Sequence, residues 1–60
     1  MSENKPLAVA VRNACLNAAL RAYEDAGISG LCAEGRWELA VQAIRELDLD
    51  KLLHEIEPQK

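Results

Sequence analysis

The sequence predicts an all-α fold: a small three-helix domain in which a long first helix forms a hairpin with a second helix, followed by a short third helix. Three observations support this prediction. Alternation of apolar and polar residues never persists, and β-branched and aromatic residues are sparse. The helix formers alanine, leucine, glutamate and arginine dominate the composition. Pro6, Gly27 and Pro58 stand where the periodic segments begin or end.

The first helix is predicted over residues 6–26, with Pro6 in its first turn and Gly27 as its C-terminal stop. At 100° per residue, its apolar residues fall on two neighbouring stripes that cover about half of the helix. The stripes are Val9, Leu16, Leu20 and Tyr23, and Val11, Cys15, Ala19, Ala22 and Ala26. A face this wide and rich in alanine can pack against more than one neighbour. In so short a chain, we expect one neighbour to belong to a second copy.

The second helix is predicted to include residues 36–47, and its apolar stripe consists of Trp37, Ala40, Val41, Ile44 and Leu47. The third helix is predicted over residues 49–57, with Asp48 as N-cap and Pro58 as its end. Its apolar face consists of Leu49, Leu52, Leu53 and Ile56. We expect residues 1–60 to form one domain, with residues 1–5 and 58–60 frayed.

The segment Ser-Gly-Leu-Cys-Ala-Glu-Gly-Arg-Trp-Glu, residues 29–38, joins the first two helices, and two paths are open for it. In one, Ser29 caps a helix that starts near Gly30 and continues through Gly35. In the other, residues 31–34 form an isolated turn and the helix begins at residue 36. We favour the first path because Ser29 is a good cap and the apolar residues here are expected to be buried. Cys32 and Trp37 are expected to fill the core at this joint.

The cysteines Cys15 and Cys32 stand too far apart for a metal-binding pair, and His54 alone cannot complete a zinc site. The polar start of the chain lacks a secretory signal, so we expect a cytoplasmic protein with reduced thiols in its core. Arg36 follows Cys32 at i+4 and could lower the pKa of an activated thiol. No base stands near Cys32 in the sequence, and we therefore expect neither an enzyme nor a cofactor.

Arg12 lies within the apolar half of the first helix, where a charge needs a partner or a route to water. We expect it to pair with Glu34 or Glu38 across a helix contact, or to reach out along the helix edge. If the protein has a site for a partner, its candidate residues are Arg12, Cys32, Glu34, Arg36, Trp37 and Glu38.

The formal net charge is −3, and no region of the chain is basic. Nucleic-acid binding and attachment to anionic membranes both depend on clustered lysine and arginine, so neither is expected. No stretch approaches the roughly 18 consecutive apolar residues of a membrane span.

The runs NACLNAALRAYEDAGISG and GLCAEGRWELAVQAIRELDLDKL resemble a group of small uncharacterised proteobacterial helical proteins of about this length, some of them loosely labelled acetyltransferases. The resemblance covers residues 7–53, and its most specific part is Ala-Glu-Gly-Arg-Trp-Glu. The common acetyltransferase fold needs a sheet and a glycine-containing loop for the cofactor pyrophosphate, and this sequence predicts neither. The resemblance therefore implies association with a larger enzyme rather than catalysis.

The sequence thus predicts a small cytoplasmic interaction or regulatory protein that acts through helix packing, as a homodimer. One alternative is an accessory subunit of a larger enzyme such as an acetyltransferase. The other is a helix-turn-helix nucleic-acid binder, which the acidic third helix disfavours.

Overall fold

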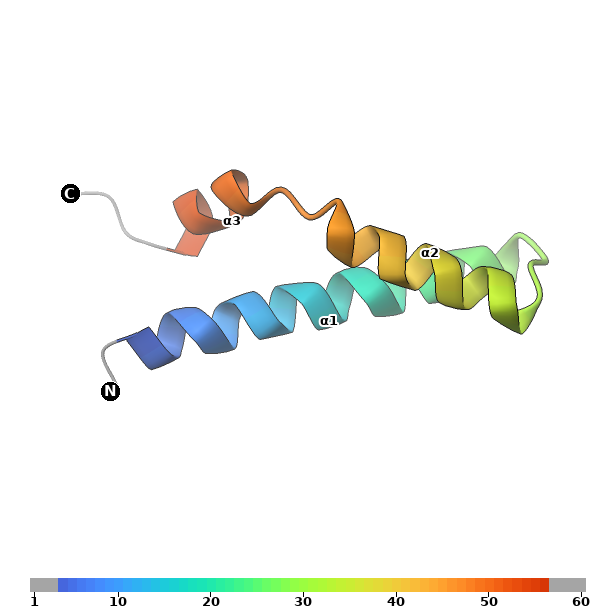
Figure 1. Ribbon diagram of the computed structural model, residues 1–60, viewed down its shortest axis with the longest axis horizontal. Coiled ribbons are helices and arrows are strands. Elements are labelled where there is room, and N and C mark those ends of the chain that lie inside the picture. The colour runs from blue at the N-terminus through green and yellow to red at the C-terminus, as the bar shows by residue number, and fades with distance from the viewer. Residues whose placement is uncertain (1–3, 57–60) are drawn as a thin grey trace.

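The computed structural model describes residues 4–56, except for the side chain of Ile56. It consists of three helices, α1 (Lys5–Ile28), α2 (Ala33–Arg45) and α3 (Leu49–Ile56), and contains no strand within these residues. Figure 1 shows α2 folded back antiparallel on the C-terminal half of α1, while α3 lies beside its N-terminal half. The predicted fold class is confirmed. Within residues 4–56, no helix combines the length and the apolar character that crossing a membrane requires.

The helix α1 extends beyond its predicted end, because Gly27 lies inside the helix and Gly30 ends it. Gly30 has a φ of 92°, a backbone conformation that side chains other than glycine rarely adopt. The N–H of Gly30 bonds to the carbonyl of Gly27, and the N–H of Leu31 bonds to the carbonyl of Ala26. These two bonds form a Schellman motif, in which Ser29 is the C-cap of α1. The prediction that Ser29 starts the next helix is therefore wrong.

The helix α2 begins at Ala33, with Cys32 at the N-cap position in an extended conformation. It runs through Gly35, as the favoured path predicts, but it starts later than expected. The isolated turn of the second path is absent, because the amide of Arg36 already bonds to the carbonyl of Cys32. The helix ends at Arg45, two residues before the predicted end.

The helix α3 begins as predicted, because the backbone N–H of Lys51 donates to Asp48 Oδ1 at 3.0 Å. Asp48 is thus its N-cap, and Asp50 lies in its first turn. At the other end of the chain, α1 begins at Lys5, one residue before its predicted start. The predicted fraying of residues 1–3 and 58–60, and the predicted stop at Pro58, lie outside the described residues.

The interior of the molecule is thin. Among the described residues, only Ala26 and Ala40 are buried hydrophobic side chains, at 3% and 7% exposure. The chain measures 44 × 22 × 15 Å, and its radius of gyration is 14.0 Å. A compact domain of this length has a radius of gyration of about 10 Å. The three helices therefore form an elongated layer rather than a closed bundle.

Candidate interaction surface

The joint between α1 and α2 is held by Arg36. Its Nε donates a hydrogen bond to the carbonyl of Leu31 at 3.0 Å. Its Cζ lies 5.5 Å from the centre of the Tyr23 ring, within the range of a cation–π interaction. This half-buried side chain therefore fixes the first turn of α2 against both the loop and α1.

Two glycines make room for this joint. A Cβ at Gly27 would lie 3.0 Å from Cζ and Nη1 of Arg36, so the guanidinium rests directly on the backbone of α1. A Cβ at Gly35 would lie 3.1 Å from Cδ2 of Leu31, which packs over the first turn of α2.

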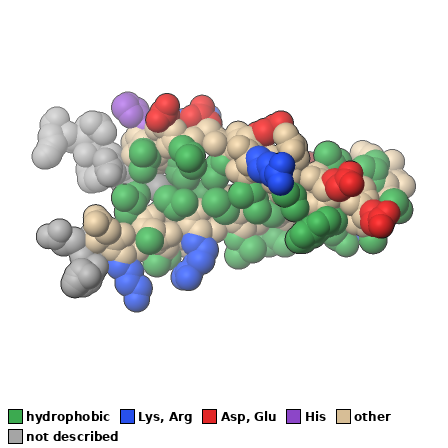
Figure 2. All heavy atoms as spheres, in the orientation of Figure 1, with side chains coloured by type: hydrophobic (Ala, Val, Ile, Leu, Met, Phe, Trp, Pro, Cys, Tyr) green, Lys and Arg blue, Asp and Glu red, His purple; other side chains and the backbone are tan. Residues whose placement is uncertain are grey.

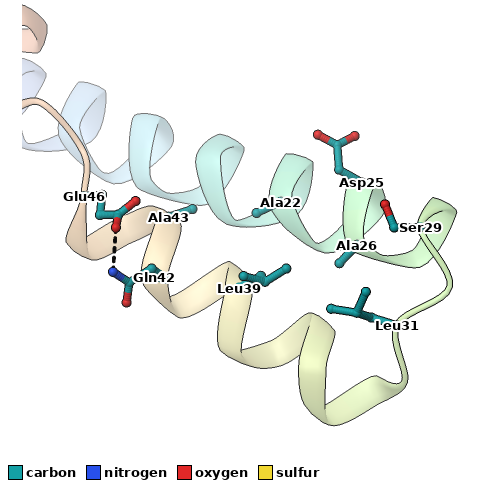
Figure 3. Close-up of a pocket in the computed structure, with 9 residues that line it drawn as sticks. All are labelled: Ala22, Asp25, Ala26, Ser29, Leu31, Leu39, Gln42, Ala43 and Glu46. Carbon is teal, nitrogen blue, oxygen red and sulfur yellow. Dashed lines mark hydrogen bonds between the residues drawn. The ribbon is translucent and has the colours of Figure 1, made fainter.

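The two sides of the α1–α2 hairpin are distinct. One side carries a shallow groove, lined by Ala22, Asp25, Ala26, Ser29, Leu31, Leu39, Gln42, Ala43 and Glu46. In Figure 3, Ala22 of α1 lies opposite Leu39 of α2 across this groove, and Ala43 lies farther from the joint. Gln42 Nε2 donates to Glu46 Oε2 at 2.7 Å along its rim. The sequence prediction missed Leu39, because this residue lies outside the apolar stripe of α2.

The opposite side of the hairpin is an exposed apolar surface, which we call the aromatic face. At 100° per residue, its members lie on the flank of each helix turned away from the groove. They are Leu16, Leu20 and Tyr23 of α1 and Trp37 and Ile44 of α2, and all are exposed. Figure 2 shows hydrophobic side chains in a band along the seam between α1 and the two later helices.

The exposure of Trp37 corrects the prediction that it fills the core, because 65% of its surface is accessible. Ala26 and Ala40 close the contact between α1 and α2, and within residues 4–56 no further helix lies over it to cover the Trp37 indole. Tyr23, which lies on an apolar stripe of α1, is 39% exposed. The helical period correctly places Tyr23 and Trp37 on the apolar faces of their helices. Within the described residues, however, no other helix covers these faces.

Charged side chains are distributed unequally along the hairpin. The first half of α1 carries Lys5 and Arg12, whereas Glu24, Asp25, Glu34 and Glu38 gather at the joint. In Figure 2, acidic groups lie at the joint end and along the outer edge of α2 and α3, and basic groups lie over the N-terminal part of α1 and over α2. The first half of α1 is thus basic, whereas the joint is acidic apart from Arg36.

Arg12 is exposed and does not lie near the acids expected to pair with it. With a rise of 1.5 Å per residue, Arg12 stands about 24 Å along α1 from Ile28, where the joint begins. Glu34 and Glu38 lie in the first turns of α2, next to that joint. Within one chain, the predicted pairing with Glu34 or Glu38 is therefore wrong, and the alternative of a side chain that reaches into water is confirmed.

Cys32 is exposed, so the prediction that it fills the core is also wrong. Its place before α2 explains why, because an N-cap side chain projects from the helix end. The backbone amides of Gly35 and Glu34 lower the pKa of the Cys32 thiol below its usual value, and the charge of Arg36 adds a smaller effect. Cys15 is half-buried in α1, and both thiols are free. The exposed His54 lies on α3, far along the chain from Cys32.

The described residues contain no group of three or more His, Cys, Asp or Glu side chains that could hold a metal ion. Of the six candidate partner-facing residues, the structure brings Cys32, Glu34, Arg36, Trp37 and Glu38 together at the joint. Arg12 stands apart from them. Comparison with protein-family models, curated proteins and solved structures gives no match, so function is inferred from the geometry of this chain.

Proposed function

We propose that this protein is a small cytoplasmic interaction or regulatory protein that acts through helix packing, as a homodimer joined through the aromatic face. The observation that carries the proposal is the aromatic face itself, where five large apolar side chains from two helices lie exposed on one side of the hairpin. A monomeric protein seldom leaves such a contiguous surface in water.

The accessible surface supports the same proposal. The chain exposes 4978 Å², whereas a compact monomer of this length exposes about 3,900 Å². The excess of about 1,100 Å² exceeds the roughly 800 Å² that each partner buries in an ordinary protein–protein interface. A second copy placed on the aromatic face would bring the exposed surface into the usual range.

The small number of buried side chains also supports a second copy as the partner. Two buried alanines supply little of the hydrophobic stabilisation that a folded domain needs. Burying a single leucine or tryptophan side chain contributes about 1.5–3 kcal/mol, and these larger side chains are the ones left exposed. The partner must therefore accompany the chain whenever it is folded, and a second copy is always present at equal concentration.

Sedimentation of the full chain over a range of concentrations tests the homodimer. We expect a dimer at micromolar concentration that dissociates on dilution. Leu20→Asp places a charge within the aromatic face and should shift the protein to monomer. Asn17→Asp adds the same charge at an exposed position of α1 outside this face and should leave the dimer intact. A stable wild-type monomer at high micromolar concentration would contradict the proposal.

A second candidate function is that of an accessory subunit of a larger enzyme. The groove that Leu39 and Ala43 line lies on the side away from the aromatic face, so a homodimer would leave it open to another protein. Co-purification from the native host tests this function. The captured enzyme should be lost with Ala43→Glu, which fills the groove, and retained with Asn17→Asp. Loss of the enzyme with both variants, or with neither, would argue against this role.

A further inference from the structure

We propose that the groove between α1 and α2 binds an amphipathic helix of a partner protein, one whose apolar stripe carries lysine or arginine on both flanks. This inference rests on the second candidate function, that of an accessory subunit, and names the chemistry of the partner. It does not depend on the homodimer, because the aromatic face lies on the other side of the hairpin. Three features of the groove support such a helix: its floor, its charges and the positions of those charges in their helices.

The floor of the groove consists of small side chains. Ala22 and Ala26 come from α1, Ala43 comes from α2, and Leu39 adds an apolar side chain that is 44% exposed. Alanines let the backbone of a third helix approach to the distance of about 8–10 Å at which helices pack. A helix laid between α1 and α2 would therefore bury Leu39 and turn this part of the layer into a three-helix bundle.

Both charged side chains that line the groove are acidic. Asp25 stands on the α1 side and Glu46 on the α2 side (Figure 3), and both are exposed. Gln42 donates to Oε2 of Glu46, which leaves Oε1 for a donor from another molecule. Arg21 lies one turn before Asp25 and is not among the residues that line the groove. An acid on each side of the groove complements a helix that carries a base on each flank.

The two acids stand where their own helices disfavour a negative charge. Asp25 lies in the last turn of α1, which carries no basic residue, and Glu46 is the C-cap of α2. The helix dipole places partial negative charge at a C-terminus, so a carboxylate there is unfavourable. A basic side chain of the partner beside each acid would relieve this repulsion.

The separation of the two acids sets the spacing of the partner's basic residues. Asp25 lies three residues beyond Ala22, towards the joint. Glu46 lies seven residues beyond Leu39, away from the joint. Because Ala22 lies opposite Leu39 (Figure 3), the two acids stand about 15 Å apart along the groove. This distance corresponds to about ten residues of a partner helix, with one basic residue near each end of its apolar stripe.

Two synthetic helical peptides test this chemistry. Both carry the same stripe of leucines at helical spacing, flanked by lysine in one peptide and by glutamate in the other. At low salt, the full chain should bind the lysine peptide about tenfold more tightly, measured by the anisotropy of a dye on the peptide. Trp37 lies on the aromatic face, so its emission should not change. Equal affinities, binding of neither peptide or a shift in Trp37 emission would overturn the inference.

Charge reversal in the chain tests whether the groove selects the peptide. A chain with Asp25→Lys and Glu46→Lys should prefer the glutamate peptide, again about tenfold. Both substitutions place a base at a helix C-terminus, which favours folding. The control, Glu24→Lys with Glu38→Lys, makes the same change of net charge at exposed positions outside the groove and should still prefer the lysine peptide. If both chains prefer the same peptide, the inference fails, and co-purification with Ala43→Glu still tests the accessory role.

Discussion

The guanidinium of Arg36 lies over the ring of Tyr23, with Cζ 5.5 Å from the ring centre, and this contact joins the start of α2 to the last turns of α1. The same side chain donates to the carbonyl of Leu31. One residue thus holds the loop, both helices and one end of the aromatic face in their relative positions.

Arg36→Ala should therefore destabilise the fold by about 1–2 kcal/mol, the combined value of one partly exposed cation–π contact and one hydrogen bond. Arg36→Lys should lose less stability than Arg36→Ala, because an ammonium group retains the positive charge over the ring. Urea unfolding at one fixed protein concentration measures both changes. Arg21→Ala, an exposed arginine of α1, serves as the control. Equal stability of the Arg36→Ala and Arg21→Ala variants would show that the contact is not stabilising.

Gly27→Ala should reveal the contact between Arg36 and the backbone of α1. Within a helix, this exchange ordinarily stabilises by about 1 kcal/mol. Here the new Cβ would meet the Arg36 guanidinium at 3.0 Å, so the gain should be largely offset. In the Arg36→Ala background, the full gain of about 1 kcal/mol should return. Equal effects of Gly27→Ala in the two backgrounds, measured by a double-mutant cycle, would contradict the close approach.

Gly30→Ala should destabilise the protein by about 1–2 kcal/mol, because its φ of 92° is unfavourable for a residue with a Cβ. Gly30→Asn should destabilise the protein less than Gly30→Ala, since asparagine tolerates positive φ better than alanine. The neighbouring C-cap Ser29 has an ordinary helical φ of −78°, so Ser29→Ala is the matched control. Chemical unfolding of the three variants gives the comparison. If Ser29→Ala lowers the stability as much as Gly30→Ala does, position 30 has no specific requirement for glycine.

Cys32 should react with iodoacetamide faster than Cys15, and its rate should reach half-maximum below the ordinary thiol pKa of about 8.5. The amides of Gly35 and Glu34 favour its thiolate. Because the folded pKa is the lower one, the thiolate stabilises the folded protein above the unfolded pKa. This contribution is lost as the pH falls through the folded pKa. The pH profile of alkylation is measured in a Cys15→Ala chain, folded and in urea. Coincident folded and unfolded profiles would contradict the lowered pKa.

The order of the helices and most of their residues follow from the sequence, because period, capping residues and prolines act locally. Asp48 begins α3 as its side chain predicts. The sequence misplaces the end of α1, because both Gly27 and Gly30 suit a helix end and the choice between them depends on tertiary contact. Arg36 packs on Gly27 inside the helix, and only Gly30 adopts positive φ.

The candidate site was predictable in part. Helical periodicity groups Trp37 with Ile44 and Leu20 with Tyr23, and these residues do share one side of the hairpin. Periodicity cannot distinguish a face that the same chain covers from a face that another molecule covers. Periodicity therefore predicts a buried Trp37, although the described residues of its own chain leave it exposed.

The fluorescence of Trp37 tests the central claim most directly, because it is the only tryptophan and 65% of its surface is exposed in a single chain. Emission and acrylamide quenching are followed on dilution, alongside the sedimenting mass. We predict a shielded, blue-shifted emission in the dimer that shifts to longer wavelength with the same midpoint as the fall in mass. Emission typical of water-exposed indole in a dimeric sample would show that the aromatic face is not the interface.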